Sequence, residues 1–293
     1  MNDDSHFSNG FSFFGKLSQF PDFIKHKAVS DEFSILDDWI QKGIISSKLE
    51  FGNSWKEIYE NSQSFEFILP FESSNKIICG VINPGFDKSG RHFPFIVFMF
   101  FKREFFDSFR IGTVHLVLNS FFYKAKQLFQ FALKSQGLNE IVNEFNKAEI
   151  RISSVIAAEN VFTEYLSSTT LAELIYRLKL KSVKGNYSAA SSSDIFSFSY
   201  CSDDENINFD TGFILELIKN KIGSGQNIPN IFKASDQNFK VRLHVYPSLP
   251  EPTEFPKLIS GEVSGLNLKD FIFAENNDIT LENLIISRQT TIN

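Results

Sequence analysis

The sequence predicts a soluble protein that mixes α-helices and β-strands. Some segments repeat apolar residues at helical spacing, as Phe33, Leu36, Ile40 and Ile44 do, whereas others are short apolar runs typical of strands. The composition is that of an ordinary globular protein, with 42% hydrophobic and 22% charged residues. A chain of 293 residues suffices for one large domain or two small ones.

The first hundred residues alternate between the two kinds of segment. An aromatic run over residues 11–17 predicts a strand, and a helix is expected from a cap at Ser30 to about Ser47. A shorter helical turn begins at Trp55. Three strands are then expected over residues 64–69, 76–83 and 93–101, and their short connections predict that they are neighbours in one sheet.

Helical spacing dominates from His115, with a stop at Gly137 and a second helix over residues 138–145. The pair Thr170 and Glu173 has the spacing of a capping box and begins another helix. Beyond these, we expect strands over residues 194–200 and 241–246, and helices over 210–222 and 253–259. The low-complexity stretch GNYSAASSS at 185–193 is interpreted as a loop within one domain.

These segments divide the chain into a flexible N-terminus (1–10), one α/β domain (11–261) and a C-terminal extension (262–293). In the extension, apolar residues alternate as in a strand: Leu266, Leu268, Phe271 and Phe273. Such a segment can dock on its own sheet or add a strand to a partner, and we favour the first.

Charge and apolar content exclude several function classes. The net charge of -6 disfavours a general nucleic-acid binder, which needs a concentrated basic face. The start, MNDDSHFSNG, lacks the positive charge and apolar region of an export signal, and the apolar run at 93–101 is too short to span a bilayer. Two cysteines are too few for a disulfide framework. We therefore expect a cytoplasmic protein with neither membrane insertion nor nucleic-acid partner.

The familiar catalytic and metal-binding motifs do not occur in the sequence. There is no P-loop, dinucleotide-binding glycine motif, HExxH, GxSxG or CxxC, and the five histidines are scattered. The absence of motifs does not exclude catalysis, but we expect no cofactor and no metal. The 35 phenylalanines are interpreted mainly as core residues, with an exposed aromatic binding surface as the alternative.

The segment NPGFDKSGRHFP at 83–94 is the most unusual in the chain, because turn residues and charges precede a deeply apolar strand. In one interpretation Arg91 binds a phosphate or carboxylate, with Asp87 orienting it or acting as an acid or base. In the other, an ion pair between Asp87 and Arg91 closes a tight loop in which Gly90 supplies a positive φ. The sequence leaves both open.

Several segments, taken together in order and spacing, resemble the TagF family of type VI secretion-associated proteins. The resemblance is dense over residues 11–94, and the best-matched part of the domain is 11–101. A looser match follows in the segment YPSLPEPTEFPKLISG, which ends at residue 261. Ser18, Pro21, Gly85 and Lys88 depart from the family pattern. The matching positions are Gly15, Lys16, Leu17, Asp22, Phe23, Asp37, Trp39, Gln41, Gly52, Trp55, Tyr59, Gly80, Val81, Pro84, Asp87, Gly90, Arg91, Phe93 and Pro94.

This resemblance implies a non-enzymatic bacterial regulator that acts after translation, in the cytoplasm, as a repressor of type VI secretion system assembly. It implies protein–protein interaction with an Fha-like forkhead-associated scaffold, and sheath or baseplate components are further candidate partners. It also implies a three-layer αβα sandwich, for which we expect a mixed, partly antiparallel sheet. The alternatives are a structural or assembly subunit of the secretion machine and, less favoured, an enzyme that uses Asp87, Arg91 and His92.

We expect the loop that carries Asp87, Gly90, Arg91, Phe93 and Pro94, with the first loop around Lys16 and Asp22, to form or support the partner surface. The competing hypothesis is that these residues only brace the fold.

Overall fold

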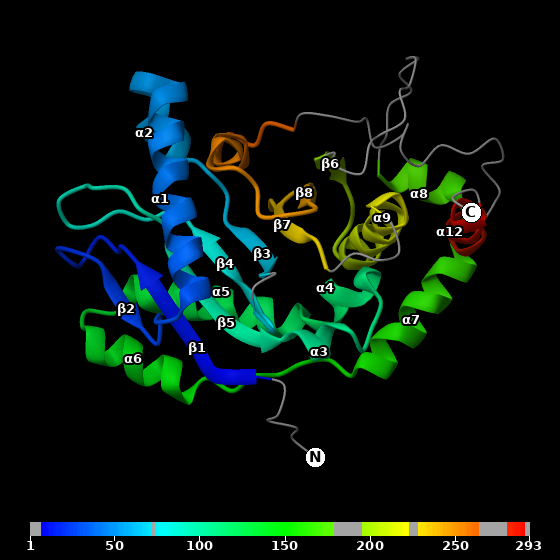
Figure 1. Cartoon of the computed structure of the whole chain (residues 1–293), viewed down its shortest axis with the longest axis horizontal. Coiled ribbons are helices and arrows are strands. Elements are labelled where there is room, and N and C mark those ends of the chain that lie inside the picture. Colours follow the sequence, from blue (N-terminus) through cyan, green and yellow to red (C-terminus); the bar gives the residue numbers. More distant parts are fainter. Residues whose placement is uncertain (1–6, 72–73, 179–194, 223–227, 264–279, 291–293) are drawn as a thin grey trace.

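The centre of the molecule is one eight-stranded sheet with the strand order β2-β1-β5-β4-β3-β7-β8-β6 (Figure 1). The computed structural model describes residues 7–71, 74–178, 195–222, 228–263 and 280–290. The strands are β1 Phe7–Gly15, β2 Ile24–His26, β3 Phe65–Pro70, β4 Lys76–Asn83, β5 Phe95–Lys102, β6 Phe196–Cys201, β7 Asn230–Ser235 and β8 Lys240–Tyr246.

Every pairing between neighbouring described strands is antiparallel, so the expectation of a mixed sheet was wrong. The predicted neighbours β3, β4 and β5 do form a meander, because connections this short favour antiparallel pairing. The pairing of β3 with β7 joins the β1–β5 part of the sheet to the β6–β8 part. The sequence analysis missed β2, which has three residues, and β7.

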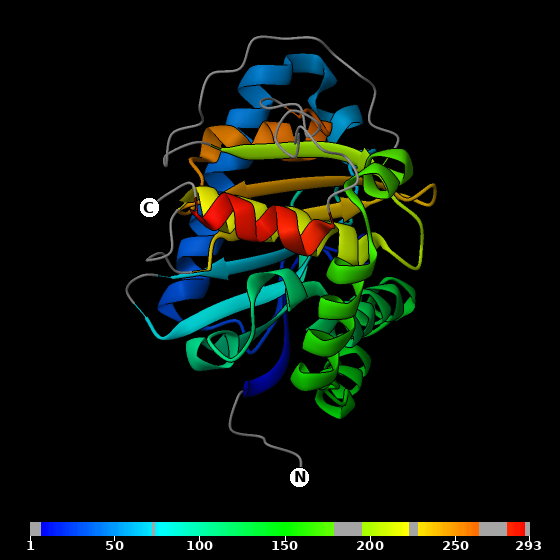
Figure 2. The ribbon, with the colours of Figure 1, turned by 90° about the vertical axis from the view of Figure 1, so that its right-hand side faces the viewer.

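Side chains alternate between the two faces of the sheet and build a separate hydrophobic cluster on each. On β4, for example, Ile77, Cys79 and Val81 belong to one cluster, whereas Ile78 and Ile82 belong to the other. Most phenylalanines that the structure describes lie in these two clusters, as the sequence analysis expected of core residues. The protein is therefore an α/β protein with helices packed on both faces of an antiparallel sheet (Figure 2).

The first face, called here the α1 face, is covered by α1 Asp31–Phe51, α2 Trp55–Glu60 and α10 Phe255–Ser260. Ser30 caps α1 by accepting a hydrogen bond from the Phe33 backbone N–H at 3.1 Å. The helix runs one turn past its predicted end near Ser47 and stops at Gly52, whose φ of 52° lies in the left-handed region.

The opposite face, called here the α5 face, is covered by eight described helices. They are α3 Arg103–Phe106, α4 Val114–Val117, α5 Asn119–Lys134, α6 Leu138–Lys147, α7 Val155–Ser168, α8 Leu171–Arg177, α9 Ile207–Ile222 and α12 Leu281–Thr290. The capping box at Thr170 and Glu173 is present as predicted. Three helices, α3, α7 and α12, were not predicted, and α12 lies against α7 and α9 (Figure 2).

Two predicted segments lie outside the described residues: the loop at 185–193 and the alternation from Leu266 to Phe273. Within the described part of the chain, no helix combines the length and the apolar character needed to cross a bilayer.

Candidate functional site

The Asp87 carboxylate is the centre of the loop between β4 and β5. Its side chain is fully buried and accepts hydrogen bonds from four donors. Its Oδ2 lies 2.9 Å from the Lys16 Nζ and 2.7 Å from the Arg91 Nε, and its Oδ1 accepts the backbone N–H groups of Ser89 and Arg91 at 2.9 and 3.0 Å. Burial alone raises the pKa of Asp87, but the N–H of Arg91, the Lys16 ammonium and the other donors outweigh it, so the pKa lies well below its usual range.

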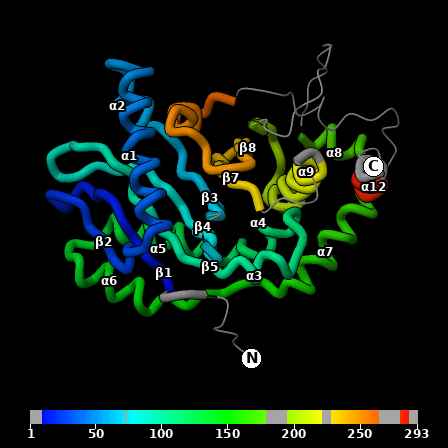
Figure 3. Tube along the Cα trace, viewed as in Figure 1, coloured from blue at the N-terminus to red at the C-terminus, as the bar shows by residue number. Residues whose placement is uncertain are grey.

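The same loop is tied to the loop between β1 and β2. The Lys88 N–H donates to the Phe20 carbonyl at 2.8 Å, and the Arg91 Nη2 donates to the Pro21 carbonyl at 2.9 Å. Asp22 lies 3.7 Å from the same guanidinium nitrogen. The two loops therefore lie side by side at one end of the sheet, as the traces show at the left (Figure 3).

Two glycines fit the tight backbone of this end of the molecule. Gly15 has a φ of 138°, and a Cβ built there would lie 2.1 Å from the Pro94 carbonyl oxygen. Only glycine allows the first strand to approach so closely. Gly90 turns the loop with a φ of 76°, as the sequence analysis predicted for the ion-paired loop.

Aromatic and basic side chains surround this buried centre, and several of them reach solvent. Phe23 is 42% exposed, Phe86 is 43% exposed and the Arg91 side chain is 58% exposed. The Lys16 ammonium lies 4.6 Å from the centroid of the Phe23 ring, which also packs on Phe93. Asp87 and Lys16 therefore brace the loops from inside, while Phe23, Phe86 and Arg91 form the surface. We call these three residues the loop-end surface.

The helix α2 supports the loop from the other side. The buried Tyr59 hydroxyl accepts a hydrogen bond from the Gly85 N–H at 3.1 Å, and burial raises the pKa of that hydroxyl above its usual range. His92 contacts Glu60 at 2.8 Å and packs its ring against Trp55 and Tyr59. The matched family positions Trp55 and Tyr59 thus hold the loop in place.

Asp37 and Trp39 lie apart from these loops, in the middle of α1. The Trp39 ring packs against Phe232 and Phe255, and its Nε1 donates to the Pro250 carbonyl at 2.7 Å. Asp37 is half-buried, and burial raises the pKa of its carboxyl. These two residues therefore position α1 and do not belong to the loop-end surface.

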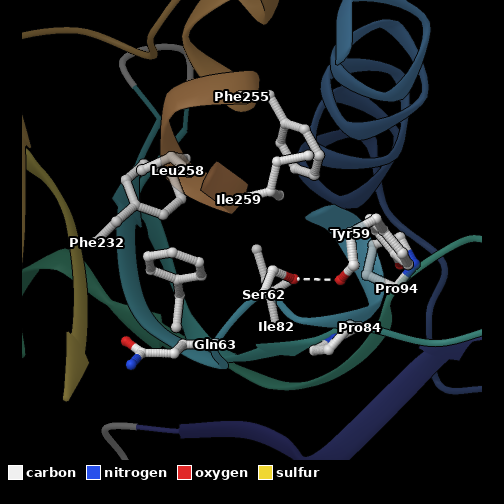
Figure 4. A pocket seen from close by; sticks show the side chains of 11 residues that line it. Tyr59, Ser62, Gln63, Ile82, Pro84, Pro94, Phe232, Phe255, Leu258 and Ile259 are labelled. Carbon is white, nitrogen blue, oxygen red and sulfur yellow. Dashed lines mark hydrogen bonds between the residues drawn. The ribbon is translucent and has the colours of Figure 1, made fainter. Parts of the chain in front are cut away.

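A small apolar pocket of about 20 Å³ lies between α2, α10 and the sheet (Figure 4). Tyr59, Pro84 and Pro94 line it on the side of the loop, and Phe255 and Ile259 line it from α10. That volume is enough for about one water molecule, so this pocket is not a cofactor site.

The side chains proposed for an enzyme do not share one set of contacts. Asp87 is held by Lys16, Ser89 and Arg91, whereas His92 is held by Glu60 and the rings around it. No group of three or more potential metal ligands occurs among the described residues. The arrangement suits recognition of another molecule by exposed aromatic and basic groups.

The sequence analysis missed a buried charged cluster where β3 pairs with β7. Glu66 stands opposite Lys233 in register, and its carboxylate lies 3.3 Å from the Lys233 Nζ and 2.6 Å from the Lys126 Nζ. Burial raises the pKa of Glu66, but Lys233 and Lys126 outweigh it and bring it to about 2. His115 is buried beside the cluster, with its Nε2 3.9 Å from the Glu66 Oε2 and neither ring nitrogen hydrogen-bonded, and burial lowers its pKa well below the usual value.

A second missed cluster lies under α7, α8 and α9. The buried Asp210 carboxylate accepts hydrogen bonds from the Tyr165 hydroxyl at 2.6 Å, the Arg177 guanidinium at 2.7 Å and the Ser202 hydroxyl. A charged residue inside an apolar segment was the available signal for both clusters, as in FEFILP around Glu66.

Residues 12–147 match the family model of the TagF N-terminal domain, described as type VI secretion system-associated. This part of the chain, which contains both loops of the site, is a TagF N-terminal domain, and the predicted resemblance is confirmed.

The fold as a whole is similar to the crystal structure of PA0076 from Pseudomonas aeruginosa PAO1. The two agree with a TM-score of 0.53 over 87% of this chain and 96% of that chain, at 15% sequence identity. At this identity the likeness concerns the fold alone. A comparison with curated proteins gave no match.

Proposed function

We propose that this protein restrains assembly of the type VI secretion system after translation, in the cytoplasm, by binding one of its components. The observation that carries the proposal is the TagF N-terminal domain over residues 12–147, whose family is type VI secretion system-associated. Such a repressor needs no active site, because it acts only by binding. The fraction of the component that it withholds rises with its affinity for that component.

The loop-end surface is the proposed contact. Exposed aromatic rings and arginine are the side chains most enriched at binding hot spots, and Phe23, Phe86 and Arg91 are held by a braced backbone. A surface fixed before binding loses less conformational entropy when the partner docks. The bracing hypothesis and the partner-surface hypothesis are then compatible. Asp87 braces the loop, whereas Arg91 both braces the loop and faces solvent.

The partner proposed here is an Fha-like forkhead-associated scaffold, the partner that the family resemblance implies. Sheath and baseplate components are the next candidates. The fold proposed for the domain is a three-layer αβα sandwich, and its support is that helices pack on both faces of the sheet.

Deletion of the gene in its host, with counting of assembled sheaths in living cells, tests the repressor role. A repressor predicts more assembled sheaths after deletion and fewer after overproduction, with unchanged levels of the other secretion proteins. Loss of assembly after deletion would contradict the proposal and would favour a structural or assembly subunit. Unchanged assembly in both strains would contradict both functions.

A further inference from the structure

The solvent-facing side of α1 carries a stripe of exposed apolar and charged residues. Ile35, Ile45 and Leu49 are 40%, 59% and 81% exposed, although they lie on the longest described helix. Between them, Asp38 and Lys42 are 61% and 60% exposed and form an ion pair at 2.7 Å. At 100° per residue all five side chains fall within an arc of about 80°, which is the spacing of a coiled-coil seam.

This stripe is complementary to itself when a second α1 runs in the opposite direction. Residue 40 is midway between Ile35 and Ile45, and it is also midway between Asp38 and Lys42. A two-fold axis at the level of residue 40 therefore places Ile35 opposite Ile45 of the second copy, and Asp38 opposite Lys42 of the second copy. Each pairing occurs twice, as an isologous contact requires.

Exposed residues at the two ends of α1 also fit this antiparallel arrangement. Val29, just before the cap of α1, is 82% exposed, and Leu49 in its last turn is 81% exposed. In the antiparallel arrangement Leu49 lies at the level of residue 31 of the second copy, in the first turn of its α1 and two residues after its Val29.

We propose that this face of α1 is a homodimer contact, in which two copies pack α1 against α1 in antiparallel fashion. In Figure 1, α1 lies on one face of the sheet, beside the two loops at the left. The proposed contact uses none of the three residues of the loop-end surface, and it is independent of the proposed function. A single helix pair is smaller than a standard interface, so the dimer forms at micromolar or higher concentration.

Sedimentation velocity of the full chain from about 1 µM to about 1 mM tests the contact. We expect a concentration-dependent shift from monomer to dimer. The variants Asp38→Lys and Lys42→Asp each place like charges opposite each other and are expected to weaken dimerisation at least about tenfold. The variant Lys134→Asp, which makes the same charge change as Lys42→Asp at an exposed position of α5, is the matched control for that variant and is expected to dimerise like the wild type.

Mixing the two single variants provides the sharper test. Every charged pair between an Asp38→Lys chain and a Lys42→Asp chain is attractive, so the mixture is expected to regain a dimer that neither variant forms alone. Both positions are exposed, and equal melting temperatures will show that the fold is kept. A wild type that stays monomeric throughout, a dimer that Asp38→Lys does not weaken, or a mixture that stays monomeric would each overturn the proposal.

Discussion

Two buried carboxylates, Asp87 and Glu66, are each held by two cations, yet they serve different parts of the molecule. Asp87 lies in a loop at the end of the sheet, and one of its cations, Arg91, is 58% exposed. Glu66 lies in the central strand pair opposite Lys233, which is 4% exposed. The first carboxylate organises a surface, whereas the second joins the two parts of the sheet.

This difference predicts which substitutions destabilise the fold and which change the surface. Asp87 accepts two backbone N–H groups in addition to its cations, so the loop keeps partners when Arg91 is lost. Glu66 is the counter-charge of an ammonium that has little access to water. Loss of a partner in the central pair therefore affects folding, and loss of a partner in the loop chiefly affects the surface.

The largest expected effect is that of Glu66→Ala on stability. The substitution leaves the buried Lys233 without its counter-charge, and we expect the free energy of unfolding to fall by about 3–5 kcal/mol in urea unfolding. The double variant Glu66→Met, Lys233→Met removes both charges and should recover most of the loss. If Glu66→Ala costs no more than a surface substitution, the central pair does not join the sheet as described.

Stability should also fall on acidification, because His115 and His244 are buried as neutral rings. Burial lowers the pKa of His115 well below its usual value and that of His244 to about 3. Below pH about 6.5 the unfolded chain binds protons that the folded chain does not, so each ring lowers the free energy of unfolding by up to about 1.4 kcal/mol per pH unit. The lowered pKa of the Glu66 carboxyl, about 2, adds a further loss as the pH falls below about 4.5, where this carboxyl binds a proton in the unfolded chain.

The variant His115→Phe keeps a ring against Phe122 and removes one proton site. Chemical denaturation between pH 7 and pH 5 should then show a shallower fall in stability than in the wild type. A slope that does not change would contradict the burial of a neutral His115.

A moderate effect is expected for Tyr59→Phe, which removes the acceptor of the buried Gly85 N–H. An unsatisfied buried donor costs about 1–3 kcal/mol, and the loss should appear as a lower denaturation midpoint. Ser62→Ala, which removes a hydroxyl next to the same pocket, is the comparison variant and should cost less. Equal losses would show that the Tyr59 hydroxyl does not support the loop.

The smallest effect on stability is expected for Arg91→Ala. Asp87 retains Lys16 and two backbone N–H groups, so the melting temperature should fall by only a few degrees in differential scanning calorimetry. Unfolding of this variant at room temperature would show that the loop serves the fold alone.

The sequence predicted the parts of the site that are local in the chain. Asp87, Gly90 and Arg91 lie within five residues, so turn residues and opposite charges were enough to make their contact one of two interpretations. The contact of Lys16 with Asp87 was not predicted, because the sequence analysis expected only that the two loops form or support one surface. The antiparallel sheet could not be predicted beyond the meander, since β2 and β7 were not recognised and the other partners, β5 for β1 and β6 for β8, lie far along the chain.

The two buried charged clusters were not predicted from the sequence, for a similar reason. Glu66 and Lys233 meet through a strand pairing that no local pattern encodes, and Tyr165, Arg177 and Asp210 come from three different helices. A charged residue in an apolar strand signals a buried partner but does not say which one.

The central claim is that exposed side chains on a braced loop end bind a component of the secretion system. It is tested most directly by affinity capture from host lysate with the wild type and with the double variant Phe23→Ala, Phe86→Ala. Tyr176→Ala, which removes an 88% exposed ring on α8, is the control. The account predicts that the wild type and the control recover type VI secretion components, that the double variant does not, and that all three melt at similar temperatures. Equal recovery of the same partners by the folded double variant would contradict it.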